Sequence, residues 1–196
     1  PIYLYKSSGK NHWGYVHSTH LVDDKEHSKY VKRLMKKLYN IEPYERVYKN
    51  CKMLTYTRKN LILFKKKIGM PMGKKDSVKI PEWILENPAF SKRCVRGIFD
   101  TDGCIRFFIR KKRASYPEIK ITNRSEKLIH QISGILRNND MRANIYMEKG
   151  GKPRKPNPIW HVSIKGRTEV PKFFDIIGSS NSKHLQKYKD WLKENG

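Results

Sequence analysis

Two aspartates near the middle of the chain, Asp100 and Asp102, stand two residues apart, and Gly103 follows directly. The spacing of apolar residues before them predicts a helix, so both carboxylates lie in its last turn, at the negative end of the helix dipole. A divalent cation would relieve this repulsion, because carboxylate and main-chain carbonyl oxygens are ligands of Mg²⁺. The residue types and their spacing therefore favour a metal site at a helix end.

Two glycines belong to the same helix. Gly103 is expected to end it in a left-handed conformation, which costs glycine little. Gly97 leaves a notch at which a second helix could approach closely. An ordinary Asp-Gly turn with an incidental Gly97 would explain the same residues, so the motif alone leaves both interpretations open.

The elements that would position this helix end follow from the hydrophobic periodicity. After the helix at 91–103, alternation over 105–110 and 118–122 predicts a hairpin with one apolar and one largely cationic face. A helix with Ser125 as its N-cap comes next, and then a second hairpin and two closing helices. These later elements are expected at residues 125–138, 144–147 with 160–165, 169–177 and 182–194.

The first half repeats this order with a period of about 100 residues. Its strands and helices are expected at residues 2–6, 13–18, 24–38, 45–49, 52–57 and 60–68. Both halves close alike, with an Ile-Gly pair and then a lysine five residues after the glycine, at Lys74 and Lys183. A counterpart of the helix at 91–103 is missing before the first strand. We therefore predict two units, residues 1–88 without that helix and residues 89–196 with it.

Basic residues occupy the polar phase of the strands in the second half. A β-ribbon fits the DNA major groove, where Arg and Lys contact guanine and Thr contacts other bases. The candidates are Arg106, Arg110, Lys120, Thr122, Ser163 and Lys165. Loop residues suited to phosphate contacts are Lys10, Lys111, Lys112, Arg113, Lys152 and Arg154. A solvated sheet face is the alternative, but cations on neighbouring strands would then repel one another without compensation.

The composition supports a nucleic-acid partner. The chain has 43 Lys and Arg against 18 Asp and Glu, a formal net charge of +25, which is typical of proteins that bind polyanions. An acidic membrane surface is the weaker alternative, because no basic amphipathic helix with a continuous apolar face stands out. Three scattered cysteines without a CxxC pair predict reduced thiols. We therefore expect an intracellular protein, in the cytoplasm or an organelle, that is neither secreted nor in a membrane.

The segment Val95–Gly103 resembles the motif of the LAGLIDADG homing endonucleases. The glycine of that motif, its two aspartates and its final glycine are matched by Gly97, Asp100, Asp102 and Gly103. The similarity extends over nearly the whole chain, including the connection at 68–81 and the ending at 177–188. The resemblance implies an α+β fold of tandem αββαββα repeats, whose antiparallel sheets form a saddle in the DNA major groove.

The resemblance also implies the chemistry. Asp102 would bind Mg²⁺, or another divalent cation such as Mn²⁺, with the Thr101 main-chain carbonyl as a further ligand. The cations would activate water and stabilise charge on the scissile phosphate. The family hydrolyses both strands of double-stranded DNA across the minor groove, at long recognition sites, and leaves short 3′ overhangs.

Other positions carry over from the family with their roles. Gly97 and Asp100 would lie where two motif helices pack together. Lys183 and its repeat mate Lys74 best match the basic residue that the family places near each active site, although solvated surface lysines are the alternative in so basic a chain. Asn123 could orient the attacking water or contact DNA, unless it only forms a turn.

The missing first motif leaves three interpretations open. The chain has lost its first helix, or two chains pair through the helix at 91–103 in a homodimer with two copies of Asp102, or the protein binds DNA without cutting it. No intein splice residues frame the chain, so we expect a free-standing, intron-encoded homing endonuclease. The alternative is a non-catalytic DNA-binding protein or an RNA-splicing maturase of the same fold.

Overall fold

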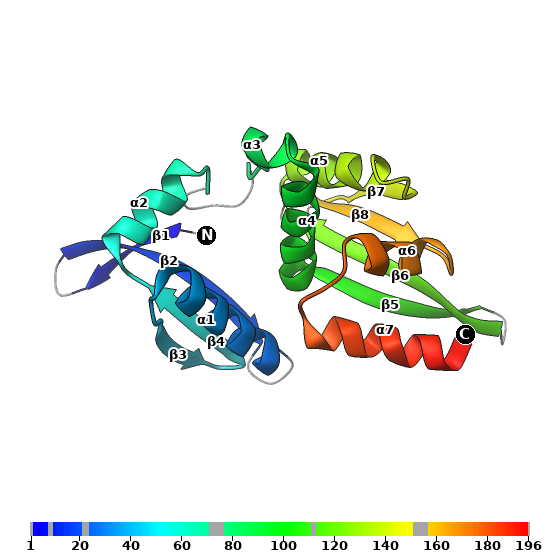
Figure 1. Ribbon diagram of the computed structural model, residues 1–196, viewed down its shortest axis with the longest axis horizontal. Coiled ribbons are helices and arrows are strands. Elements are labelled where there is room, and N and C mark those ends of the chain that lie inside the picture. The colour runs from blue at the N-terminus through cyan, green and yellow to red at the C-terminus, as the bar shows by residue number, and fades with distance from the viewer. Residues whose placement is uncertain are drawn as a thin grey trace. The chain divides into compact units, whose positions relative to one another are not determined.

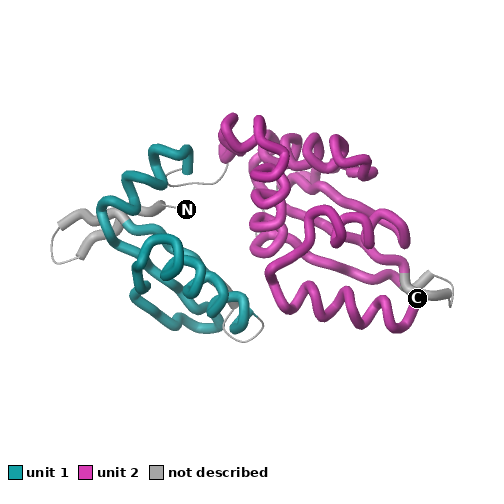
Figure 2. The backbone as a smooth tube through the Cα atoms, in the orientation of Figure 1, with its two compact units in different colours: residues 1–75 teal, residues 76–196 magenta. Residues whose placement is uncertain are grey.

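The computed structural model describes residues 2–7, 10–20, 24–70, 77–110, 113–150 and 157–195. The chain forms two compact units, unit 1 (Pro1–Lys75) and unit 2 (Asp76–Gly196), shown in Figure 2. Each unit is α+β and contains one four-stranded antiparallel sheet (Figure 1). The predicted fold class is confirmed, whereas the boundary lies earlier than the one we predicted between residues 88 and 89.

Unit 1 has its strands in the order β1-β2-β4-β3. Its elements are β1 (Ile2–Ser7), β2 (Lys10–His20), α1 (Lys25–Tyr39), β3 (Tyr44–Tyr48), β4 (Cys51–Tyr56) and α2 (Lys59–Lys67). All elements predicted for this half are present. Strand β2 is longer than predicted because its first half pairs with β1 and its second half with β4. A small core joins both helices to β4 through Met35, Leu54, Tyr56 and Leu61.

Unit 2 repeats this arrangement, with the strand order β5-β6-β8-β7. Its elements are α3 (Glu82–Leu85), α4 (Pro88–Asp102), β5 (Gly103–Arg110), β6 (Arg113–Asn123), α5 (Glu126–Arg137), β7 (Ala143–Glu148), β8 (Ile159–Lys165), α6 (Glu169–Ile176) and α7 (Ser182–Asn195). Both units have the same strand order and a helix between their two hairpins, so the predicted internal repeat is confirmed.

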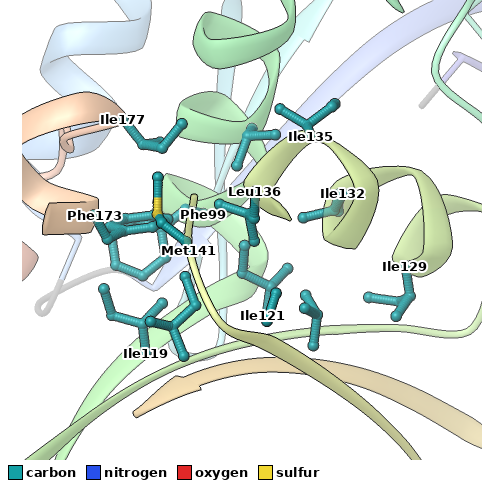
Figure 3. Packing of buried hydrophobic residues seen from close by; sticks show 14 of the residues in the cluster. Phe99, Ile119, Ile121, Ile129, Ile132, Ile135, Leu136, Met141, Phe173 and Ile177 are labelled. Carbon is teal, nitrogen blue, oxygen red and sulfur yellow. The ribbon is translucent and has the colours of Figure 1, made fainter. Parts of the chain in front are cut away.

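The core of unit 2 lies between its sheet and the helices that cover one face of it (Figure 3). Alternate residues of the strands are almost fully buried, as the sequence predicted, and these include Ile105, Ile119, Ile121, Val162 and Ile164. Helix α5 covers them with an apolar stripe that contains Ile129, Ile132 and Leu136. Phe99 of α4 meets Phe173 of α6 edge to face, with ring centroids 5.0 Å apart. The motif helix is therefore anchored in the core by one face.

Capping residues set where the two long helices of the core begin. The Asn87 side chain accepts a hydrogen bond from the Phe90 N–H at 3.1 Å, and Pro88 supplies the first helical residue of α4. Ser125 caps α5 as predicted, since its hydroxyl accepts from the Leu128 N–H at 3.2 Å. These local signals fix the start of α4 and therefore the position of its other end.

The segment ahead of α4 packs on unit 2, which explains the early boundary. Ile80 is 2% exposed, and its N–H donates to Gln131 Oε1 at 2.8 Å. The Ser125 hydroxyl donates to the Val78 carbonyl at 2.5 Å. The short helix α3 follows and was not predicted, because four residues show no periodicity.

Helices α2 and α6 are each followed by a glycine in the same conformation, as the repeat predicted. Gly69 and Gly178 have φ values of +93° and +73°, in the left-handed region that glycine enters at little cost. Among the helices in the described residues, none has both the length and the apolar character needed to span a membrane.

Candidate active site and nucleic-acid interface

The motif helix α4 passes directly into strand β5. Asp102 is the last residue of the helix, and the N–H of Gly103 donates to the Phe99 carbonyl. Our prediction of a left-handed Gly103 is wrong, because its φ of −99° and ψ of 166° are extended backbone. Glycine is required for another reason, since a Cβ there would lie 2.5 Å from the Phe99 carbonyl oxygen. This close approach places Asp102 at the point where helix and sheet meet.

The two predicted metal ligands, Asp102 and Thr101, are exposed at this junction. The Thr101 hydroxyl lies 3.2 Å from the carbonyl oxygens of both Gly97 and Ile98, so it is held against its own helix. In the part of the chain that the structure describes, no cluster of three or more His, Cys, Asp or Glu side chains could hold a metal ion. A single carboxylate with main-chain carbonyls suits Mg²⁺, which keeps several waters and takes further ligands from substrate phosphates.

Asp100 has a very different environment from Asp102, because it is only 6% exposed. Its Oδ1 accepts hydrogen bonds from the Ser179 hydroxyl at 2.5 Å and from the N–H groups of Ser180 and Asn181 at 3.0 and 3.3 Å. We expected Asp100 at an interface between two motif helices, whereas its carboxylate binds the connection between α6 and α7. Sequence reasoning missed these partners because they lie 79–81 residues away in the chain.

Lys183 lies in the first turn of α7, close to these contacts. The Asn181 Oδ1 accepts from the Lys183 N–H at 3.1 Å and so caps the helix. The next residue, His184, packs on Phe99 of α4 with ring centroids 4.5 Å apart. The half-buried Lys183 is therefore carried by a turn that packs against the last turn of the motif helix. Its predicted counterpart Lys74 lies outside the described residues.

Gly97 lies on an exposed part of α4. A Cβ at this position would meet no atom of the described residues within 4 Å. The surface of the helix is thus open at the predicted notch. The packing of a second helix against it stays a prediction.

The polar face of the unit 2 sheet contains a buried carboxylate. We define this face as Arg106, Glu118, Lys120, Thr122, Tyr146, His161, Ser163 and Lys165. Glu118 is 1% exposed and accepts a hydrogen bond from Arg106 Nη2 at 2.6 Å. Its other oxygen lies 3.3 Å from Lys165 Nζ. Our argument that cations on this face repel one another without compensation is therefore wrong for these two. The alternating pattern placed Glu118 on this face, but the pairing partners came only with the strand order.

The other side chains of the polar face also contact one another. Thr122 Oγ1 lies 3.0 Å from His161 Nδ1, within hydrogen-bonding distance. The Tyr146 ring stacks on His161 with centroids 4.7 Å apart, and Lys120 Nζ lies 5.1 Å from the centre of the Tyr146 ring. Ser163 is only 1% exposed, so it lies beneath its neighbours. The cationic side chains of the polar face thus contact Glu118 or the Tyr146 ring and do not extend independently into solvent.

Three other predicted positions are placed less directly. The Asn123 side chain accepts from the Ser125 N–H at 3.0 Å, so it forms the turn ahead of α5 that we named as its alternative role. Arg110 is the last residue of β5, but its side chain lies outside the described part of the structure. Lys112 also lies outside the described residues.

Comparisons with known proteins agree with the motif. Residues 89–178 match the family model of the LAGLIDADG-like domain. The fold is similar to that of the homing endonuclease I-DmoI, solved in complex with DNA and Ca, with a TM-score of 0.63 and 15% identity over 95% of this chain and 90% of that one. It is also similar to the K262A mutant of I-SmaMI, with a TM-score of 0.62 and 12% identity over 98% of this chain and 85% of that one.

Two sequence relatives are tRNA-splicing ligases RtcB. The protein from Methanopyrus kandleri is 27% identical over 135 residues, or 64% of this chain, and that from Pyrococcus abyssi is 28% identical over 134 residues, or 63%. The matched segments make up only 13% and 14% of the two ligases. The chain therefore spans a small fraction of the length of these relatives.

Proposed function

We propose that this protein is a site-specific DNA endonuclease of the homing type, because residues 89–178 match the family model of the LAGLIDADG-like domain and the fold is similar to that of the homing endonuclease I-DmoI. Its substrate is double-stranded DNA with a long recognition site. Its reaction is Mg²⁺- or Mn²⁺-dependent hydrolysis of phosphodiester bonds across the minor groove. Similar endonucleases have been solved with target DNA and Mg, Mn or Ca, which supports both the substrate and the need for a divalent cation.

The exposed carboxylate of Asp102 at the junction of α4 and β5 is the observation that carries this proposal. Asp102 and the Thr101 main-chain carbonyl would hold the cation, which supplies an activated water and stabilises charge on the phosphate. Lys183, in the first turn of α7, would add positive charge beside the same phosphate. Lys74 would do so for the other strand.

The polar face would bind the major groove. Arg106 and Lys165 share the buried Glu118, which favours a fixed direction for both cations when they meet base edges. Lys120 and Thr122 would contact neighbouring bases. The remaining proposed DNA contacts are Arg110 and Lys112, whereas the buried Ser163 and the turn-forming Asn123 are no longer proposed as contacts.

Cleavage of both strands requires a second carboxylate. We propose that a second motif helix packs against α4 at the open Gly97 notch, so that two helix ends form a paired active site. A helix ahead of residue 1 or a second copy of this chain in a C2 dimer would supply it. Sedimentation of the protein with and without Gly97→Trp distinguishes the two sources, because only a dimer dissociates.

The test begins with selection of the binding site from a library of random-sequence duplexes in Ca²⁺. The selected duplex is then incubated with the protein in Mg²⁺, in Mn²⁺ or in EDTA. We expect both strands to be cut in Mg²⁺ and Mn²⁺ and neither in EDTA. Asp102→Asn should lower the single-turnover rate by at least about a hundredfold, while the exposed Asp175→Asn, the same change in charge on α6, should leave it unaltered.

Tight binding by the wild-type protein without metal-dependent cleavage would overturn the nuclease proposal. That outcome, with affinity unaffected by Asp102→Asn, would instead support the non-catalytic DNA-binding protein. Preferential binding of intron RNA over the selected duplex would support the maturase.

A further inference from the structure

We propose that Asp100 is a positioning residue of the nuclease site, whose buried carboxylate fixes the first turn of α7, and with it Lys183, against the end of the motif helix. The inference rests on the proposed function, because the placement of Lys183 matters to the reaction only if a phosphodiester is cleaved there. The carboxylate of Asp100 itself is engaged by its own chain.

Helix α4 holds the connection between α6 and α7 at two points that are one helical turn apart. Arg96 Nε donates to the Ile177 carbonyl at 2.5 Å. Four residues later, and so on the same face of the helix, Asp100 binds Ser179, Ser180 and Asn181. The whole connection is therefore fixed along α4 rather than held at a single contact.

The chemistry of the second point requires a carboxylate. Both oxygens of Asp100 lie 3.0 Å from the Ser180 N–H, and Oδ1 also accepts from the Ser179 hydroxyl. An ionised acceptor makes these bonds shorter and stronger than a neutral group would. An amide in its place would turn an NH₂ group toward one of these donors, and a buried donor left unsatisfied is costly.

One side chain transmits the position of α4 to α7. Asn181 Nδ2 donates to the main-chain carbonyl of Asp100 at 3.0 Å, while Asn181 Oδ1 accepts from the Lys183 N–H at 3.1 Å. Asp102 comes two residues after Asp100, and Lys183 two residues after Asn181. The contact between Asp100 and Asn181 therefore sets the position of the catalytic carboxylate relative to the lysine.

Capping alone does not explain Asp100, because α7 already has its N-cap in Asn181. The bonds that Asp100 accepts are additional to this cap, and they join the residues directly ahead of α7 to α4. The tilted ring contact between His184 and Phe99, with centroids 4.5 Å apart, adds to these bonds at the same turn. The geometry thus assigns the polar bonds the task of orientation.

The first experiment measures amide hydrogen exchange in the full chain without DNA or metal. In Asp100→Asn, the amides of Ser180 and Asn181 should exchange about tenfold faster than in the wild type, which corresponds to the loss of a charge-assisted bond. Asp175→Asn, an exposed aspartate with the same change in charge, is the matched control and should not alter them. Ser179→Ala, which removes one donor only, should give a smaller effect. Unchanged exchange of these amides in both Asp100→Asn and Ser179→Ala would overturn the inference.

The second experiment measures cleavage and binding separately. Asp100→Asn should slow single-turnover cleavage on the order of a hundredfold, with the Kd for DNA in Ca²⁺ unchanged. If Asp100 acts through Lys183, adding Asp100→Asn to Lys183→Ala should cause no further loss. Independent, multiplicative losses would overturn the positioning role. A wild-type protein that does not cleave DNA would refute the proposed function. The exchange rates would still decide whether Asp100 fixes the connection between α6 and α7.

Discussion

The carboxylate of Glu118 lies directly across the β5–β6 ladder from Arg106 and accepts a hydrogen bond from its guanidinium at 2.6 Å. Lys165 faces the same carboxylate from the other neighbouring strand, β8. An arginine that is already held in one direction loses less side-chain entropy when it binds a base edge. We therefore expect this pair to contribute to specificity for a sequence more than to affinity for DNA in general.

Replacement of the carboxylate should separate these two quantities. Glu118→Gln should lower the ratio of the affinities for the selected site and a scrambled duplex by about tenfold, since one well-placed arginine discriminates bases by roughly 1–3 kcal/mol. Affinity for the scrambled duplex should rise slightly, because a negative charge is removed. Titrations at one fixed salt concentration measure both. Glu126→Gln makes the same change in charge at an exposed position of α5, and an equal effect of the two variants would contradict the role of Glu118.

Lys120 tests the polar face by its salt dependence. Lys120→Ala should weaken binding to the selected site and reduce discrimination at one base pair, because we propose that the lysine contacts a base. A slope of log K against log[salt] reduced by about 1, with unchanged discrimination, would show that it neutralises a phosphate instead. Lys127→Ala, at an exposed position of α5, is the control. An unchanged affinity for Lys120→Ala would remove this residue from the interface.

Substitution by alanine should change the free energy of unfolding in opposite directions at different glycines. Gly103→Ala should destabilise the protein by about 1–3 kcal/mol, because the new methyl group overlaps the backbone of Phe99. Gly97→Ala and Gly134→Ala meet open space within their helices and should each stabilise it by roughly 0.5–1 kcal/mol. Urea unfolding measures all three.

Cleavage then distinguishes the two stabilising variants. If a second helix packs at Gly97, Gly97→Ala should slow cleavage, whereas Gly134→Ala on α5 should not. Equal activity of the two would argue against close helix packing at this notch.

The thiol of Cys94 reports whether its side of α4 is packed. Burial raises the pKa of the Cys94 thiol to about 11, so at pH 8 only about 0.1% of it is the reactive thiolate. We expect a thiol reagent at pH 8 to modify the exposed Cys51 first, and the rate at Cys94 to rise about tenfold per pH unit toward pH 11. Mass spectrometry of the peptides measures both rates. Equal rates at pH 8 would show that this face of the motif helix is open.

Much of the fold was predictable because its signals are local. Ser125 before an apolar stripe gives a helix start, and alternation around Ile119 and Ile121 gives a buried strand. The position of Asp102 at a helix end follows from the same kind of signal. Residues 77–85 carry no such periodicity, so their packing on unit 2 could not be predicted.

The contacts at the site that the sequence did not predict join distant parts of the chain, whereas the wrong prediction for Gly103 concerns its local conformation. The partners of Asp100 come from the connection between α6 and α7, which no local pattern places beside α4. The neutralisation of Arg106 by Glu118 depends on strand register, which alternation alone does not determine. Gly103 was assigned the commonest conformation of a glycine after a helix, whereas its φ and ψ are those of the strand that begins there.

The hydrogen bonds that join Ile80 to Gln131 and Val78 to Ser125 have a practical consequence for recombining this protein with its relatives. A hybrid joined at residue 88 would take residues 78–80 from one parent and their partners Ser125 and Gln131 from the other. A hybrid joined at residue 76 transfers those bonds intact. Exchange of the two halves between homologues should therefore be tolerated better at the earlier junction than at the later one.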